Sequence, residues 1–178
     1  MRYFCRILSL FVCVCMGIAC MGCAASPPDY FAYREGDFCA ELRGTLDKKA
    51  FCAKITVKGD GTGRAIEIEY LADEQTGKET SLTGLKIFAR CGADGTLGGA
   101  AQVVLGEMDL ETEGELLAGV LSPVTVLLSP SDFSAVQKEG DSYRLTFSDG
   151  AILALNTQGL PRTFSSPSLS FEVIWWEK

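Results

Sequence analysis

The sequence predicts an α+β fold that is predominantly antiparallel β. Apolar and polar residues alternate with period two in several segments, as expected for strands with one buried face. Turn signals separate these segments at intervals of about 10 to 15 residues, and helices do not alternate with them as they do in a parallel sheet. We therefore expect about eight or nine strands, with one short helical region.

The first hairpin is predicted at residues 38–58, with its turn at Lys48-Lys49. In that register Cys52 lies opposite Thr45, and Cys39 lies roughly 20 Å further along the sheet, which is too far for a disulfide bond. Cys91 adds no short Cys-x-x-Cys spacing, so we expect no metal site. The apolar face of the hairpin is predicted to consist of Ala40, Leu42, Leu46, Phe51, Ala53, Ile55 and Val57.

Further strands are predicted at 65–71, 82–91 and 98–105, and a final strand at 169–176. Residues 143–156 predict a second hairpin, because Asp149-Gly150 suits a two-residue turn. This turn sets Phe147 opposite Ile152 on the apolar face.

The helical region is predicted to be broken into short pieces. Residues 112–115 have the spacing of a helix capping box, and apolar residues follow at helical spacing. Pro123 and Pro130 favour separate pieces at 123–128 and 132–137.

Composition excludes several function classes. The 178 residues contain no histidine, so catalysis and metal binding that need an imidazole are excluded. A formal net charge of −7, with scattered bases, argues against a nucleic-acid partner. No nucleophile motif or phosphate-binding loop is present, so we expect a protein without catalytic residues or cofactor.

An acidic run has residues of one charge at every second position: Glu107, Asp109, Glu111, Glu113 and Glu115. Clustered carboxylates are typical calcium ligands. A solvated strand end that leads into an acidic helix start explains the same pattern, and we favour that interpretation.

The N-terminus resembles the signal and lipobox of bacterial lipoproteins. Arg2 and Arg6 precede an uncharged stretch, 7–22, which ends in Gly22-Cys23 followed by two alanines. The resemblance implies that residues 1–22 are a signal peptide and that Cys23 carries acyl chains such as palmitate. Residues 23–35 would then be the lipidated cysteine and spacer, and residues 36–178 the folded domain.

Alternatives remain for this segment. Ala19-Cys20 is a second possible cleavage site, which would make Cys20 the lipidated residue. An uncleaved membrane anchor or a plain secretion signal also fits the length of the apolar stretch. In each case the domain lies on the extracytoplasmic side, and a lipid anchor would hold it at the cell membrane.

Residues 36–178 resemble the outer-membrane lipoprotein carrier and receptor superfamily (LolA/LolB-like). The resemblance rests on the element order and on Leu121-Ser122-Pro123, Tyr143-Arg144-Leu145, Gly159-Leu160-Pro161 and Trp175-Trp176. It implies a curled antiparallel sheet, an incomplete barrel, with short helices over its concave face. We assign none of the family's cavity residues to this chain.

The expected function is that of a non-enzymatic binder or carrier of a hydrophobic ligand, such as a lipid or acyl chain. The alternative is an envelope interaction or scaffold lipoprotein whose core is filled and which docks another protein. Apolar stripes more often form a closed core than a cavity. The candidate cavity residues are Ile66, Ile68, Tyr70, Leu85, Ile87, Leu117, Val120, Leu121, Leu127, Phe133, Phe147 and Trp175.

Overall fold

The computed structural model describes residues 29–59, 63–73, 77–92, 97, 101–105, 108–112, 115–128 and 133–178. These residues form one 11-stranded sheet in the order β6-β5-β4-β3-β2-β1-β11-β10-β9-β8-β7, and every neighbouring pair is antiparallel. The edge strands β6 and β7 do not pair with each other, so the sheet is open. The predominantly antiparallel β fold is therefore confirmed.

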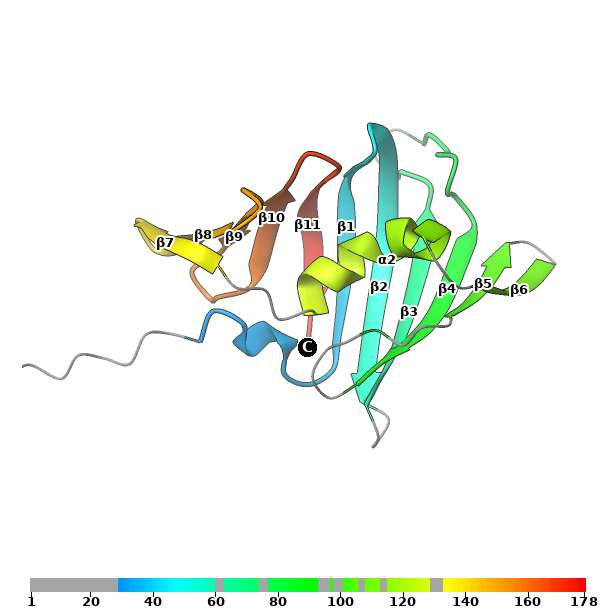
Figure 1. The fold of residues 1–178 in the computed structure, drawn as a ribbon, viewed down its shortest axis with the longest axis horizontal. Coiled ribbons are helices and arrows are strands. Elements are labelled where there is room, and N and C mark those ends of the chain that lie inside the picture. The colour runs from blue at the N-terminus through cyan, green and yellow to red at the C-terminus, as the bar shows by residue number, and fades with distance from the viewer. Residues whose placement is uncertain are drawn as a thin grey trace, which may run out of the picture.

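The strands, in chain order, are β1 (Phe38–Leu46), β2 (Lys49–Gly59), β3 (Arg64–Leu71), β4 (Leu85–Cys91), β5 (Ala101–Leu105), β6 (Met108–Thr112), β7 (Phe133–Glu139), β8 (Ser142–Phe147), β9 (Ile152–Leu155), β10 (Pro161–Ser165) and β11 (Leu169–Glu177). A 3₁₀ turn, η1 (Ala32–Arg34), precedes β1. The helix α2 (Glu115–Leu128) connects the two edge strands and lies across the middle of the sheet, which bends behind it (Figure 1).

The faces of the first hairpin are as predicted, although its turn is not. Asp47 and Lys48 adopt positive φ angles of 47° and 68°, so the turn comes one residue earlier and Arg43, not Thr45, pairs with Cys52. A shift of two residues in the pairing leaves every side chain on its face, because side chains alternate with period two. Ala40, Leu42 and Ile55 are accordingly fully buried.

The second hairpin differs from its prediction by one residue. Leu145 pairs with Leu153, and Thr146 pairs with Ile152. The turn has three residues instead of two, and Gly150 adopts a φ of 82° at its end. A shift of one residue exchanges the faces of β9, so Leu153 and Leu155 are buried where Ile152 and Ala154 were expected.

The helical prediction is wrong in two respects. Residues 115–128 form one continuous helix with Pro123 inside it, and residues 132–137 are not helical, because β7 begins at Phe133. β7 pairs with β8, so hydrogen bonding across the sheet decides its conformation. The acidic run contains a separate strand, β6, in which Asp109 and Glu111 pair with β5, and α2 begins at Glu115. A strand that leads into a helix start is the order expected for this run.

We call the side of the sheet that faces α2 the inner face and the opposite side the outer face. The inner face carries the core: Phe51, Ile55, Ile68, Ile87, Leu145 and Leu153 are each at most 2% exposed. Burial of these branched and aromatic side chains in one hydrophobic core supplies the main stabilisation of the fold.

Candidate functional site

The apolar surface beneath α2 is the first candidate site, since an apolar ligand would have to enter there. Val124 and Leu127 of the helix are fully buried, and Leu121 and Leu128 nearly so. On the strand side, the hydroxyl of Tyr70 donates a 2.7 Å hydrogen bond to the carbonyl oxygen of Val120. The helix is thus attached to the sheet by apolar packing and by the hydrogen bond from Tyr70 of β3.

Ser122 explains why the helix continues through Pro123. A proline has no N–H, so Pro123 leaves the carbonyl oxygen of Gly119, four residues earlier, without its helical donor. The Ser122 hydroxyl donates a 2.7 Å hydrogen bond to that oxygen. The lost backbone bond is therefore replaced locally, and the helix does not end.

The last turn of α2 is held by the segment 30–34, which we call the strap. Arg34 donates from Nε to the carbonyl oxygen of Leu127 at 2.8 Å and from Nη2 to that of Val126 at 3.3 Å. These are carbonyls of the last helical turn, which have no N–H partner within the helix. Arg34 also lies 3.9 Å from the ring centre of Phe31. Burial lowers the pKa of Arg34, but a guanidinium keeps its charge in proteins.

Aromatic side chains surround the strap. Tyr33 meets Trp176 edge to face at 5.6 Å, and Trp176 stacks on Phe38 at 4.5 Å between ring centres. Two polar atoms in this cluster, Tyr33 Oη and Trp176 Nε1, are buried without a hydrogen-bond partner in the described part of the chain. Unsatisfied buried donors destabilise a folded protein, so the strap is packed at some energetic cost.

The structure places ten of the twelve candidate cavity residues on the side of the sheet that faces α2. The remaining two are Leu117, whose side chain is outside the described part, and Trp175. Those that are buried in the core are Ile66, Ile68, Tyr70, Ile87, Leu121, Leu127 and Phe147, and those that pack partly exposed against it are Leu85 and Val120. These nine residues therefore belong to, or pack against, one hydrophobic core on this side of the sheet.

Phe133 lies at the margin of this surface. Its side chain is 37% exposed and contacts the rings of Tyr30 and Phe31 at 5.8 and 6.0 Å between centres. It belongs to the border between the strap and β7 and is not beneath α2.

Trp175 is a correction to the predicted face. Glu41 pairs with Trp175 and Leu42 pairs with Val173, so Ile174 is the extra residue of a β-bulge. A bulge shifts the alternation by one residue. Trp175 therefore lies on the outer face, 43% exposed, while Trp176 takes the inner position. Sequence alternation alone gives no sign of this bulge.

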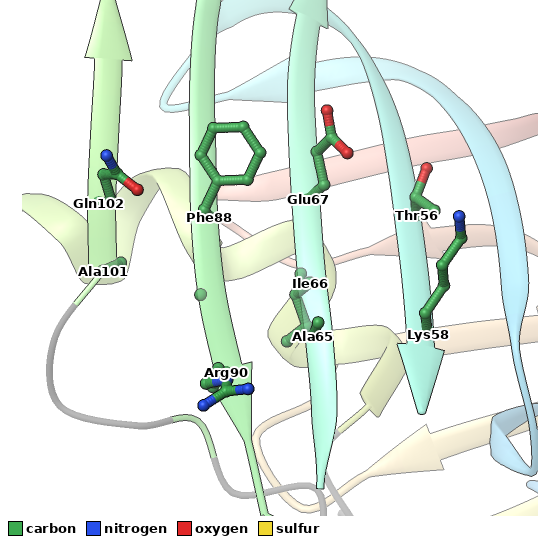
Figure 2. Close-up of a pocket in the computed structure, with 10 residues that line it drawn as sticks. Thr56, Lys58, Ala65, Ile66, Glu67, Phe88, Arg90, Ala101 and Gln102 are labelled. Carbon is green, nitrogen blue, oxygen red and sulfur yellow. The ribbon is translucent and has the colours of Figure 1, made fainter. Parts of the chain in front are cut away.

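The outer face contains a second candidate site that the sequence did not indicate. A hollow of about 440 Å³ lies over strands β2 to β5, and we call it the outer hollow (Figure 2). Two rows of paired residues form it: Lys58, Ala65 and Arg90, and beside them Thr56, Glu67, Phe88 and Gln102. These side chains point away from α2, which lies behind the strands in Figure 2.

The cysteines do not form a site with one another. Cys39 pairs with Thr56, four residues along β2 from Cys52, and its sulfur lies 3.5 Å from the Thr56 hydroxyl. In the described ranges no disulfide bond joins Cys39, Cys52 or Cys91, and no three Cys, Asp or Glu side chains gather as metal ligands. Burial raises the pKa of the Cys52 thiol, which makes it less reactive.

Comparison with known proteins gives a limited answer. No family model matches the chain, and no curated protein matches its sequence. A solved structure of an uncharacterized conserved protein from Thermus thermophilus is similar at 11% identity and a TM-score of 0.49, over 84% of this chain and 83% of that one. A DUF1329 family protein from Desulfovibrio piger is similar at 12% identity and a TM-score of 0.43, over 84% and 89%. At these levels the comparisons assign no function.

The predicted anchor and part of the acidic run lie outside the residues that the structure describes. Residues 1–28, with Cys20 and Cys23, are not among the described residues, and neither are Glu107 and Glu113. Within the part of the chain that the structure describes, no helix has the length and apolar character needed to cross a membrane.

Proposed function

We propose that this protein is an extracytoplasmic lipoprotein that binds or carries a hydrophobic ligand, such as an acyl chain, beneath α2. The observation that carries the proposal is the arrangement of the helix: it crosses the apolar inner face of an open sheet and is attached near its middle by Tyr70 and in its last turn by Arg34. A ligand enters when α2 lifts, and its chain replaces the helix against Ile55 and Ile68.

The filled inner face is the closed state in this proposal. A carrier without ligand would expose a large apolar surface if its cover stayed open, and such a surface favours aggregation. The affinity for ligand is then reduced by the fraction of molecules in which α2 is lifted. Substitutions that loosen the helix without removing apolar surface should therefore strengthen binding.

This expectation can be tested with Tyr70→Phe, which removes the hydrogen bond to Val120 and keeps the ring. We expect palmitate to bind the full chain, with an affinity roughly fivefold higher in Tyr70→Phe, since a lost hydrogen bond is worth about 1 kcal/mol. Lys54→Gln, on the exposed outer face of β2, is the matched control and should bind as the original protein does. Absence of palmitate binding, together with native mass spectra free of co-purified lipid, would contradict the proposal.

The lipid anchor is tested separately by labelling cells with an alkyne-tagged palmitate. We expect the label on the protein, and its loss in Cys23→Ser but not in Cys20→Ser. Label lost only in Cys20→Ser would move the anchor to that residue. An unlabelled protein would indicate a plain signal or an uncleaved membrane anchor.

A second function is favoured by one specific observation. Val124 and Leu127 of the helix have no exposed surface, and neither do Ile55 and Ile68 of the strands. A core that stays filled suits an envelope scaffold that docks another protein. Cross-linking that recovers one partner in stoichiometric amount, with no lipid bound, would support this alternative.

A further inference from the structure

We propose that Arg34, Tyr33 and Trp176 form a head-group site for a carboxylate, so that the ligand beneath α2 is a fatty acid. This site rests on the proposed function and specifies the class of its ligand. The three side chains lie next to one another: Arg34 Cζ is 5.6 Å from the ring centre of Tyr33, which is 5.6 Å from that of Trp176. They lie at the end of α2 that Arg34 holds, where η1 is beside the end of β11 (Figure 1).

Arg34 is a buried cation without an ionic partner. It is 9% exposed, and no Asp or Glu of the described ranges forms an ion pair with it. An arginine is almost never buried to this extent unless it is paired. Asp29 is exposed, and its Oδ1 accepts the backbone N–H of Phe31. Burial lowers the pKa of Arg34 more than Asp29 raises it, as expected for a cation that lacks a close counter-ion.

The donors of Arg34 have the geometry that a carboxylate needs. Nε and Nη2 lie on one edge of the guanidinium, and they donate to two carbonyl oxygens, those of Leu127 and Val126. The two oxygens of a carboxylate accept from such a pair of N–H groups, and these bonds are stronger because both partners are charged. A carboxylate can therefore replace the last turn of α2 on Arg34. Binding of the head group then releases the helix that covers the apolar face.

Tyr33 and Trp176 supply two further donors. Tyr33 Oη and Trp176 Nε1 are buried, and neither has a hydrogen-bond partner among the described residues. A carboxylate has about four acceptor sites, enough for these two donors and for the pair on Arg34. The hydroxyl of an uncharged lipid has about two acceptor sites and no charge, so it satisfies fewer of these donors.

The test compares palmitate with hexadecanol, which has the same chain length and no charge. Binding of each tritiated lipid to the immobilised full chain is measured in nonionic detergent at mildly alkaline pH. The readout is the ratio of the hexadecanol Kd to the palmitate Kd. A looser helix changes both Kd values by the same factor, and uptake of lipid by the detergent is equal in all samples, so neither effect alters this ratio between variants.

Arg34→Gln should lower the ratio at least about tenfold, because it removes hydrogen bonds from a charged group. Arg162→Gln is the matched control: it removes an exposed cation from β10 and should leave the ratio unchanged.

Tyr33→Phe and Trp176→Phe each remove one donor and keep an aromatic ring. Each should lower the ratio about three- to tenfold. Trp175→Phe, on the outer face, is their control and should leave it unchanged. Thermal unfolding confirms that each variant is folded. If Arg34→Gln does not fold, Tyr33→Phe and Trp176→Phe decide the result.

The proposal is overturned if folded Arg34→Gln retains the ratio of Arg162→Gln, or if Tyr33→Phe and Trp176→Phe both behave like Trp175→Phe. In either case the two lipids still bind, so the proposed function stands with a ligand of another head group. Failure of the original protein to bind either lipid contradicts the proposed function, and the head-group site with it.

Discussion

Ser122 and Gly119 are joined by a 2.7 Å hydrogen bond from the serine hydroxyl to the glycine carbonyl, and this bond replaces the one that Pro123 cannot make. Both residues lie in α2, the α-helix of the described structure, which continues through Pro123. A helix in two pieces would present two more sets of unpaired backbone groups beneath an otherwise apolar cover.

We therefore predict that Ser122→Ala lowers the free energy of unfolding by about 1 kcal/mol. In a Pro123→Ala background the restored N–H bonds to Gly119, so the same change should have almost no effect. Urea unfolding of the four proteins measures both values. Equal effects of Ser122→Ala in the two backgrounds would show that the hydroxyl does not replace the missing bond.

Arg34 is predicted to control the opening of the last turn of α2. Arg34→Gln removes the charged donor to Leu127 and Val126 and should destabilise the fold by about 2 kcal/mol. Hydrogen exchange should speed up in residues 124–128 more than in β1 or β2. Uniform acceleration over the whole sheet would instead indicate a general loss of stability.

Two buried tyrosines are predicted to respond in opposite directions to loss of the hydroxyl. Tyr70→Phe removes a satisfied donor and should lower the free energy of unfolding by about 1 kcal/mol. Tyr33→Phe removes a hydroxyl that has no hydrogen-bond partner among the described residues, and it should leave stability unchanged or raise it by up to about 1 kcal/mol. Chemical denaturation of both variants provides the comparison. A loss in Tyr33→Phe equal to that in Tyr70→Phe would mean that the Tyr33 hydroxyl is hydrogen-bonded in solution.

Stability is predicted to fall in alkaline solution. Burial raises the pKa of both Tyr70 and Tyr33, an effect that the charge of Arg34 partly offsets at Tyr33. The unfolded chain then loses these protons at lower pH than the folded chain. The stabilisation is complete below the ordinary tyrosine pKa of about 10 and decreases as the pH rises above it. The free energy of unfolding is measured with urea at about one-unit steps from pH 8 to 11, around that value. It should fall less steeply with pH in Tyr70→Phe than in the original protein.

Gly44 is predicted to tolerate no side chain, in contrast to Gly119. A Cβ on Gly44 would collide with the carbonyl oxygen of Ser170 in β11, so Gly44→Ala should destabilise the fold by about 2 to 3 kcal/mol. A Cβ on Gly119 meets open space within α2, so Gly119→Ala should stabilise it by about 0.5 to 1 kcal/mol. Thermal unfolding of the two variants tests the difference in sign.

The sequence indicated the faces of β1 to β4 correctly because alternation is a local property. Ile66, Ile68 and Tyr70, three candidate cavity residues at alternate positions of β3, are all buried on the inner face. The error in the predicted turn at Lys48-Lys49 did not change the faces, since a shift of two residues in the strand pairing preserves them. The error in the predicted turn at Asp149-Gly150 shifted the pairing by one residue, and this exchanged the two faces of β9.

The candidate sites were harder to predict because they depend on how elements meet. The sequence placed apolar residues in α2, but not the latch that Arg34 forms with Leu127 from 93 positions away. It gave no indication of the outer hollow, since Lys58, Ala65 and Arg90 become neighbours only when β2, β3 and β4 pair in register.

By itself, the sequence determined an antiparallel sheet with one apolar side and one polar side. Tertiary structure decided whether the helix continued through Pro123, which tryptophan faced inward and whether the inner face was filled. The physical reason is range: side-chain alternation is fixed within a few residues, whereas a bulge, a carbonyl latch or a filled core results from contacts between segments far apart in the chain.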